Sequence, residues 1–169
     1  MATRITTNIL IFKFSLSLGG GERFTLALAE GLMHRGYAVT VFSNYRRLID
    51  ILRAQSITTQ RFSWGGEPGS RRGVIAYCLF FPYHYLRMYF LLRRYRSKNP
   101  TTVIFQNLHD KLLGTSIAKR FGYTVLWVEH VSPHLWLTRN WLKKFYQTLA
   151  RTTNRVVMVS KDLQREFTS

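Results

Sequence analysis

Cysteine is almost absent from this sequence of 169 residues, and acidic side chains are scarce. Because Cys78 has no partner within the chain, a disulfide scaffold is excluded and a reducing compartment such as the cytoplasm is favoured. Only 8 Asp and Glu oppose 25 Lys and Arg, which gives a formal net charge of +17. A charge of this size attracts polyanions, so nucleic acid, an anionic membrane surface and phosphorylated substrates are the partner classes to consider.

The sequence also lacks a long uninterrupted apolar run. The longest apolar stretch covers residues 74–92, but it contains Pro82, His84 and Arg87. A membrane span needs about 20 apolar residues, and a charge near its centre costs at least ~2.5 kcal/mol. We therefore expect this stretch to be a helix that is buried on one side. The apolar run at residues 9–12 is too short for a signal peptide.

Apolar segments of strand length alternate with segments of helical periodicity along the whole chain. Strands are expected at residues 8–12, 37–42, 57–62, 102–105, 123–128 and 155–159. Helices are expected from the glycine-rich segment to Gly36, at residues 47–55, 74–97 (bent or begun anew at Pro82), 111–121 and 135–152, and from residue 161. Strands that are apolar throughout are typical of a parallel sheet covered on both faces. The pattern predicts one α/β domain over residues 1–169, a Rossmann-like doubly wound parallel sheet.

In such a sheet, ligands bind at the carboxyl ends of the strands, so the residues after each strand are candidate site residues. The first strand is followed by Gly19, Gly20, Gly21, Glu22 and Arg23. Glycines let a ligand approach the backbone closely, and the N-terminus of the next helix attracts anions. A plain tight turn before a helix would explain the glycines equally well. The spacing is neither that of the G-x-G-x-x-G fingerprint nor that of a phosphate loop ending in GK[ST].

Polar side chains also follow the fourth and fifth predicted strands. After the fourth strand, Asp110 is expected to cap the next helix, and His109 suits a loop or a site equally well. After the fifth strand, Glu129 and His130 are adjacent and could tune each other's protonation. Glu129 could instead only balance nearby arginines. The histidines lack the spacing of a zinc site, and no G-x-S-x-G elbow is present, so neither a metal site nor a serine hydrolase is expected.

Several segments together resemble glycosyltransferase family 4. LGGGERFTLALAEGLMHRGYAVTVFS, at residues 18–43, is similar to the family's opening pattern of a GG-x-E/Q loop, an amphipathic helix and RGH/Y-x-V-x-V. VIFQNLHD, WVEH and RVVMVSKDLQREF extend the resemblance over nearly the whole chain. The resemblance implies a GT-B architecture, of which this chain is similar to the N-terminal, acceptor-side domain. It also implies sugar transfer from a nucleotide sugar with retention at the anomeric carbon.

Roles for individual residues follow from the same resemblance. The loop from Gly19 to Glu22 would face the diphosphate of the donor, mainly through Gly20 and Gly21. His130, with Glu129 beside it, would be the catalytic candidate near the transferred sugar. The acceptor side would include Arg23, His109 and Asp110. Neither a metal nor another cofactor is expected, because the positive loop and cleft would stabilise the leaving diphosphate.

The family's second domain, with its nucleotide pocket and E-x7-E glutamates, has no counterpart in the chain. The chain would then be a fragment, one half of a split enzyme or a remnant. We expect it to need that domain, or a partner chain that carries it, and to be inactive alone. Two acid-free stretches, residues 68–109 and 130–161, combine basic and aromatic side chains, which suits a membrane interface. The expected membrane face comprises Arg93, Arg94, Arg96, Trp136, Trp141, Lys143 and Lys144.

The expected location is therefore peripheral, at the cytoplasmic face of the membrane, with a lipid-linked or envelope glycan as acceptor. Trp136 and Trp141 could instead be core residues or cover an interface with the missing domain. Two other functions stay open at this point. One is a non-catalytic module that binds a partner chain, and the other is a basic nucleic-acid-binding module. No RRM, KH or helix-turn-helix pattern supports the latter, so no nucleic acid is expected as a partner.

Overall fold

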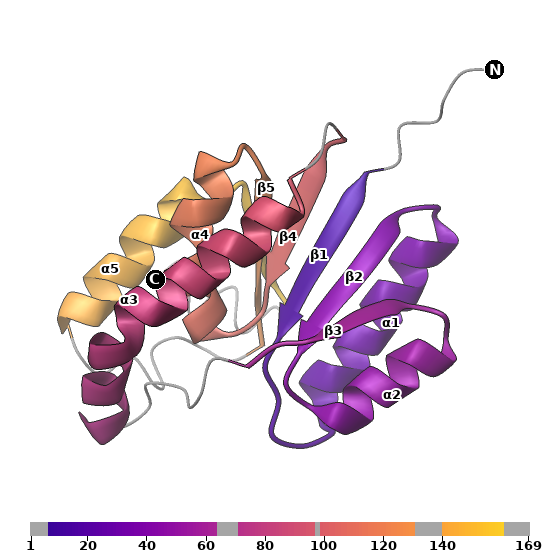
Figure 1. Cartoon of the computed structure of the whole chain (residues 1–169), viewed down its shortest axis with the longest axis horizontal. Helices are drawn as coiled ribbons and strands as arrows, with labels where there is room; N and C mark the ends of the chain where they lie inside the picture. The colour runs from indigo at the N-terminus through magenta and orange to yellow at the C-terminus, as the bar shows by residue number, and fades with distance from the viewer. Residues whose placement is uncertain (1–6, 64–70, 97–98, 131–139, 161–169) are drawn as a thin grey trace.

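The computed structural model describes residues 7–63, 71–96, 99–130 and 140–160, in which strands and helices alternate (Figure 1). The strands are β1 (Asn8–Lys13), β2 (Ala38–Ser43), β3 (Thr58–Arg61), β4 (Thr101–Phe105), β5 (Thr124–Glu129) and β6 (Arg155–Met158). The helices are α1 (Gly20–His34), α2 (Arg46–Ala54), α3 (Arg71–Arg94), α4 (Leu108–Arg120) and α5 (Asn140–Thr152). The alternation expected from the sequence is confirmed within these ranges. The helix expected from residue 161 lies outside them.

The described strands form one parallel sheet in the order β3-β2-β1-β4-β5-β6. Figure 1 shows α1 and α2 covering one face of this sheet and α3, α4 and α5 covering the other. The doubly wound fold predicted from the sequence is therefore confirmed. The strand order reverses between β1 and β4, so their carboxyl ends flank the crevice where sheets of this kind bind ligands.

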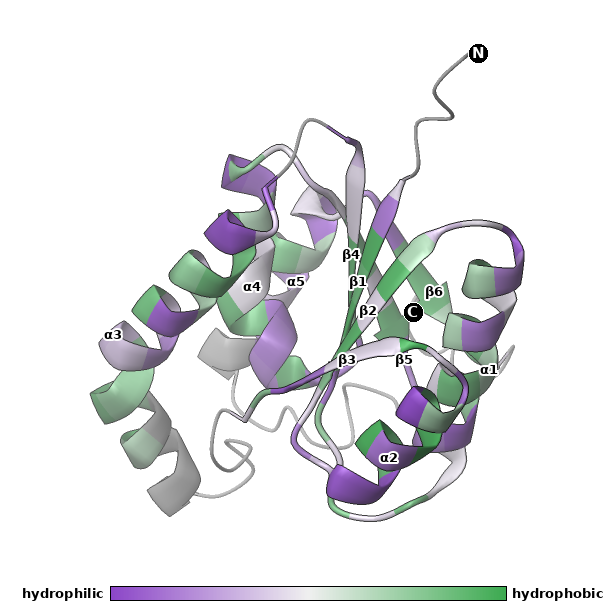
Figure 2. Ribbon diagram, turned by 45° about the vertical axis from the view of Figure 1, so that its right-hand side comes forward, coloured by the Kyte–Doolittle hydropathy of each residue, from purple (hydrophilic) through white to green (hydrophobic). Residues whose placement is uncertain are grey.

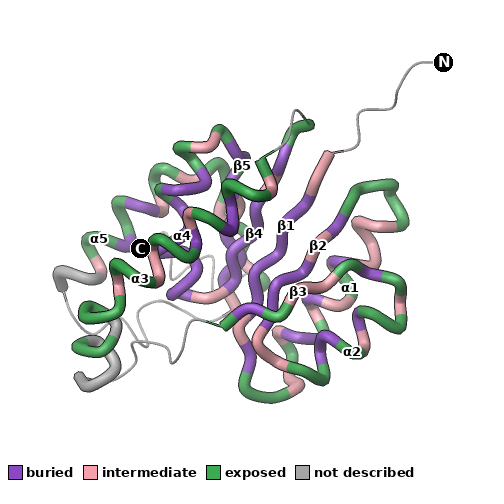
Figure 3. Tube along the Cα trace, viewed as in Figure 1, coloured by how far each residue is buried: buried purple, intermediate pink, exposed green. Residues whose placement is uncertain are grey.

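Each face of the sheet has its own hydrophobic core. Leu10 and Phe12 of β1 point toward α3, α4 and α5, whereas Ile9 and Ile11 point toward α1 and α2. This alternation is the period of two that a strand imposes on its side chains. Figure 2 shows the central strands as hydrophobic, and Figure 3 shows them as buried while the outer sides of the helices are exposed. Because both faces are covered, the middle positions of the central strands β1 and β4 are apolar, whereas the edge strand β3 has the polar sequence TTQR.

The ends of the helices agree with the sequence in part. Gly36 and Gly122, expected to end two helices, have φ angles of +84° and +78°, a region that favours glycine. The expected cap at Asp110 is wrong, because α4 begins at Leu108 and Asp110 lies buried in its first turn. Pro82 does not start a new helix either, since α3 continues through it.

Candidate functional site at the carboxyl edge of the sheet

The loop between β1 and α1 is held in place by asparagines from both neighbouring strands. The Asn44 side chain, just after β2, accepts from the Ser15 N–H (2.8 Å) and donates to the Ser15 carbonyl (2.8 Å). The Asn107 side chain, just after β4, accepts from the Phe14 N–H (2.9 Å). The loop that leads into the glycines is therefore fixed to the β2 and β4 ends on both sides of the crevice.

Glu22 organises the first turn of α1 from inside. One carboxylate oxygen accepts from the Gly19 N–H (2.7 Å), and the other accepts from the Ser15 hydroxyl (2.6 Å) and lies 3.4 Å from the Lys13 Nζ. Burial by itself would raise the pKa of Glu22, but these hydrogen bonds and the Lys13 charge outweigh it and hold the pKa below its usual value. Glu22 is therefore ionised at neutral pH and fixes both the glycine loop and the Lys13 ammonium.

Gly20 and Gly21 differ in what surrounds them. A Cβ added at Gly20 would meet no atom of the described residues within 4 Å, so this position borders open space at the N-terminus of α1. A Cβ added at Gly21 would lie 2.8 Å from the Lys13 Nζ and 4.0 Å from the His130 Cδ2. Gly20 thus leaves room for a ligand, whereas Gly21 makes room for the Lys13 and His130 side chains to approach the helix.

His130 lies at the end of β5 and packs against the same helix. Its ring is edge-on to Phe24, with 5.1 Å between the centroids, and its Nε2 lies 3.0 Å from the Gln106 side-chain oxygen. Burial, followed by the positive charges of Lys13 and Lys111, lowers the pKa of His130 from 6.5 to about 4. The imidazole is therefore neutral at pH 7 and can hydrogen-bond a ligand, but it is not a proton donor in the imidazolium form.

Gln106 connects the His130 imidazole to the first turn of α1. The Thr25 hydroxyl lies 2.8 Å from the Gly21 carbonyl and 2.9 Å from the Gln106 side-chain oxygen, so it can donate to either. The same Gln106 oxygen accepts from the His130 ring when the proton of the neutral imidazole is on Nε2. In that tautomer Nδ1 is a hydrogen-bond acceptor.

Glu129 is not paired with His130, although the two are adjacent in sequence. Its carboxylate is 2% exposed, lies 2.6 Å from the Lys111 Nζ and accepts a hydrogen bond from the Tyr146 hydroxyl. The Lys111 Nζ also donates to the Val128 carbonyl (2.9 Å). Burial, partly offset by Glu129, lowers the pKa of Lys111. Glu129 therefore pairs with Lys111 and Tyr146 instead of its sequence neighbour His130, and this geometry favours a structural role for Glu129.

The residues expected on the acceptor side are not gathered at one point. Arg23 is exposed on the first turn of α1. His109 and Asp110 are buried at the start of α4, where the His109 ring packs edge-on against His84 of α3 at 5.5 Å. Within the described residues, no group of three His, Cys, Asp or Glu side chains could hold a metal ion.

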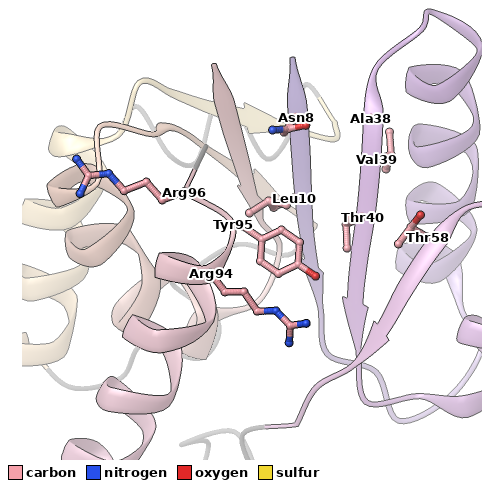
Figure 4. A pocket seen from close by; sticks show the side chains of 9 residues that line it. All are labelled: Asn8, Leu10, Ala38, Val39, Thr40, Thr58, Arg94, Tyr95 and Arg96. Atoms are coloured by element: carbon pink, nitrogen blue, oxygen red, sulfur yellow. The ribbon is translucent and has the colours of Figure 1, made fainter. Parts of the chain in front are cut away.

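A cavity of about 320 Å³ opens at the opposite, amino edge of the sheet (Figure 4). Asn8, Ala38 and Thr58 at the strand starts line it, with Arg94 and Tyr95 from the end of α3 beside them. Ligands of doubly wound sheets bind at the carboxyl ends instead. We therefore place the candidate site at the carboxyl edge, around Gly20 and His130.

The expected membrane face is only partly described. Arg93, Arg94 and Arg96 are exposed at the end of α3 and just beyond it, and Lys144 is exposed on α5, where Lys143 is partly buried. Trp136 and the Trp141 side chain lie outside the described parts. None of the described helices has the length and apolarity needed to cross a membrane.

Comparisons with known proteins agree with this fold. Residues 18–169 match the family model described as Glycosyltransferase Family 4. A glycosyltransferase from Rickettsia africae has a TM-score of 0.67 and 17% identity, over 96% of this chain and 39% of the other. Anabaena Alr3699/HepE, in complex with UDP and glucose, gives 0.67 and 16%, over 95% and 40%. Acinetobacter baumannii MurG gives 0.59 and 16%, over 90% and 41%.

These structures share the fold with this chain, which spans about two fifths of their length. Among curated proteins, none matches the sequence significantly.

Proposed function

The chain belongs to glycosyltransferase family 4, and from this premise we propose that it supplies the acceptor-side half of a sugar-transfer site. The reaction would move a sugar from a nucleotide sugar to a lipid-linked or envelope glycan, with retention at the anomeric carbon. The fold supports this proposal, because it matches the N-terminal half of GT-B glycosyltransferases. The open space beside Gly20 carries the proposal. This space lies at the N-terminus of α1, close to the neutral imidazole of His130.

The leaving group of such a reaction is a nucleoside diphosphate, which gains negative charge as the bond to the sugar breaks. The first N–H groups of a helix have no partners within the helix, and its dipole attracts anions. Among the described residues, no atom lies within 4 Å of a Cβ built at Gly20, so a phosphate could approach the backbone there. The Lys13 ammonium lies beside Gly21, where it would add positive charge. Stabilising developing charge in this way requires no metal.

His130 would bind the transferred sugar rather than act as an acid. A pKa of about 4 keeps its ring uncharged at neutral pH. With Nε2–H donating to the Gln106 oxygen, the Nδ1 lone pair remains to accept a hydrogen bond from a sugar hydroxyl. Gln106 would then orient the histidine, and Phe24 would limit the rotation of its ring.

The nucleotide itself would be held by a second domain or by a partner chain that carries it. The structures matched above are more than twice as long as this chain. We therefore assign the donor pocket to that second domain or partner chain, and we also propose the acceptor and the membrane-peripheral, cytoplasmic location. The positive net charge supports an acceptor or surface of negative charge.

Amide chemical-shift mapping tests the site on this chain directly. UDP-glucose added to ¹⁵N-labelled protein should shift the amides of residues 19–22 and the ring of His130. Gly20→Val should abolish these shifts without loss of stability, because its side chain would enter open space. Ala27→Val places the same side chain at an exposed position on the same helix and should leave the shifts intact. Unchanged shifts in Gly20→Val, or shifts confined to the Arg94 and Tyr95 cavity, would contradict the proposal.

Transfer by the chain with its completing domain gives a second test. His130→Ala should lower the turnover by at least tenfold while changing the unfolding free energy by less than about 1.5 kcal/mol, because its side chain is only partly buried. Gln106→Leu should lower the turnover less, since it disturbs only the orientation of the ring. If turnover and stability fall in parallel for both variants, His130 is structural.

A further inference from the structure

Helix α3 carries an apolar stripe on its solvent side. The stripe consists of Ile75, Leu79, Tyr83, Leu86 and Phe90, which are between 54% and 73% exposed. Their spacing of four, four, three and four residues places them along one face of the helix. At 1.5 Å per residue, the stripe is roughly 22 Å long. Figure 3 shows most of the coloured part of α3 as exposed.

The opposite side of α3 already forms part of the core. Met88, Leu91 and Leu92 are buried against the sheet and α4, and Phe81 and Tyr85 pack on the same cluster. The sequence predicted only this buried side. A helix that is apolar on both sides has a second apolar surface to cover, and isolated exposed side chains would not form a continuous row.

The charged residues of α3 itself are all basic. Helix α3 contains no Asp or Glu, and it begins at Arg71 and Arg72 and ends at Arg93 and Arg94. Arg87 borders the stripe, where it donates to the Ser63 carbonyl (2.8 Å) and lies over the Phe62 ring. The stripe therefore lies between two arginine pairs, an arrangement that suits a helix lying flat on an anionic surface.

We propose that the apolar stripe of α3 enters the headgroup region of an anionic lipid bilayer, with Arg93 and Arg94 at the end of the helix bound to lipid phosphates. A second copy of the chain fits less well, because two stripes in contact would bring these arginines together with no acid on α3 to neutralise them. The His84–His109 contact joins the middle of α3 to the start of α4 at the carboxyl edge. Lipid docking through the stripe would therefore hold the candidate site near the membrane surface.

This inference deepens the membrane-peripheral part of the proposed function and rests on it for its biological purpose. Vesicle binding is measured without sugar transfer, so either proposal can fail alone. The probe is a vesicle of phosphatidylcholine with 30% phosphatidylglycerol, compared with pure phosphatidylcholine. The chain should sediment with the anionic vesicles at least tenfold more strongly, and the binding should weaken as salt rises.

Matched variants separate the stripe from the overall charge. Leu79→Gln combined with Phe90→Gln should lower vesicle binding at least tenfold without changing any charge. Leu16→Gln combined with Tyr37→Gln makes similar changes at exposed positions outside α3 and should leave binding unchanged. All four positions are exposed, so the variants should fold, and circular dichroism would verify this. Equal binding by both double variants would overturn the proposal.

The single cysteine reports directly on the docked surface. Cys78 is exposed on α3 next to Leu79, so an environment-sensitive dye can be attached without altering another residue. The emission should shift to the blue on anionic vesicles, whereas a dye at Ser17→Cys in a Cys78→Ser background should not respond. No shift at Cys78, or an equal shift at both positions, would refute docking through α3. So would dimerisation through the stripe by a chain that binds no vesicles.

Discussion

The pair of Lys111 and Glu129 gives the sharpest test of how this site is built. The two side chains are 1% and 2% exposed and lie 2.6 Å apart, and the Tyr146 hydroxyl donates to the same Glu129 carboxylate. Removing one member of such a pair leaves a buried charge without its partner, which costs about 3–5 kcal/mol. We expect Lys111→Met to lower the unfolding free energy by this amount. The total stability of a domain is only about 5–15 kcal/mol, so the loss is large but measurable.

The double variant separates a structural role from a chemical one. Glu129→Gln alone should also be costly, because it leaves the buried Lys111 ammonium without a counter-charge. Lys111→Met combined with Glu129→Gln removes both charges and should recover most of the loss, to within about 2 kcal/mol of the wild type. Urea unfolding followed by far-UV circular dichroism measures all four proteins. Additive losses in the double variant, or an unchanged stability of Glu129→Gln, would refute the structural role and return Glu129 to the catalytic candidates.

Two further predictions concern packing and pH. Gly114→Ala should lower the unfolding free energy by about 1–3 kcal/mol in a urea titration, because its Cβ would clash with the buried Phe105 ring. Gly31→Ala, whose nearest neighbour is a flexible arginine end at 3.4 Å, should instead stabilise the chain by about 0.5–1 kcal/mol, and a loss there would contradict the packing argument. The His130 ring takes up a proton near pH 6.5 in the unfolded chain and only near pH 4 in the folded one. The stability that the neutral His130 ring contributes is therefore complete above pH 6.5 and is lost as the pH falls to 4. The loss is about 3 kcal/mol at most, and roughly 1–2 kcal/mol after solvent screening; His130→Gln should lack it in unfolding curves measured across this range.

The fold could be predicted because its signals are local. A parallel sheet covered on both faces needs apolar strands, and the positive φ angles after α1 and α4 need glycines. The cap at Asp110 failed for a reason outside its own segment. Two polar residues, Gln106 and Asn107, precede α4, and the Asn107 side chain accepts a hydrogen bond from the Phe14 N–H, 93 residues earlier in the chain.

The candidate site was harder to predict because its partners come from distant segments. In the sequence, Lys13 is only the last residue of a strand. Its contact with Gly21 and Glu22 arises from the packing of α1. Glu129 and His130 look like a pair in sequence, but successive residues of an extended chain point to opposite sides of the sheet. A charged residue that closes an otherwise apolar strand, as Lys13 closes β1, was the available signal for the missed cation.

The strand order also determines when each pair of strands can form during synthesis. β1 is made first, yet it lies in the middle of the sheet and pairs with β4, so contacts such as Phe14 to Asn107 span 93 residues. At roughly 5–20 residues per second, a ribosome needs about 5–20 s to deliver that partner. During this interval one edge of an apolar strand is unpaired, and such edges are where chains associate wrongly. We therefore expect aggregation of the nascent chain to peak while α3 is being made, and to fall once β4 has emerged.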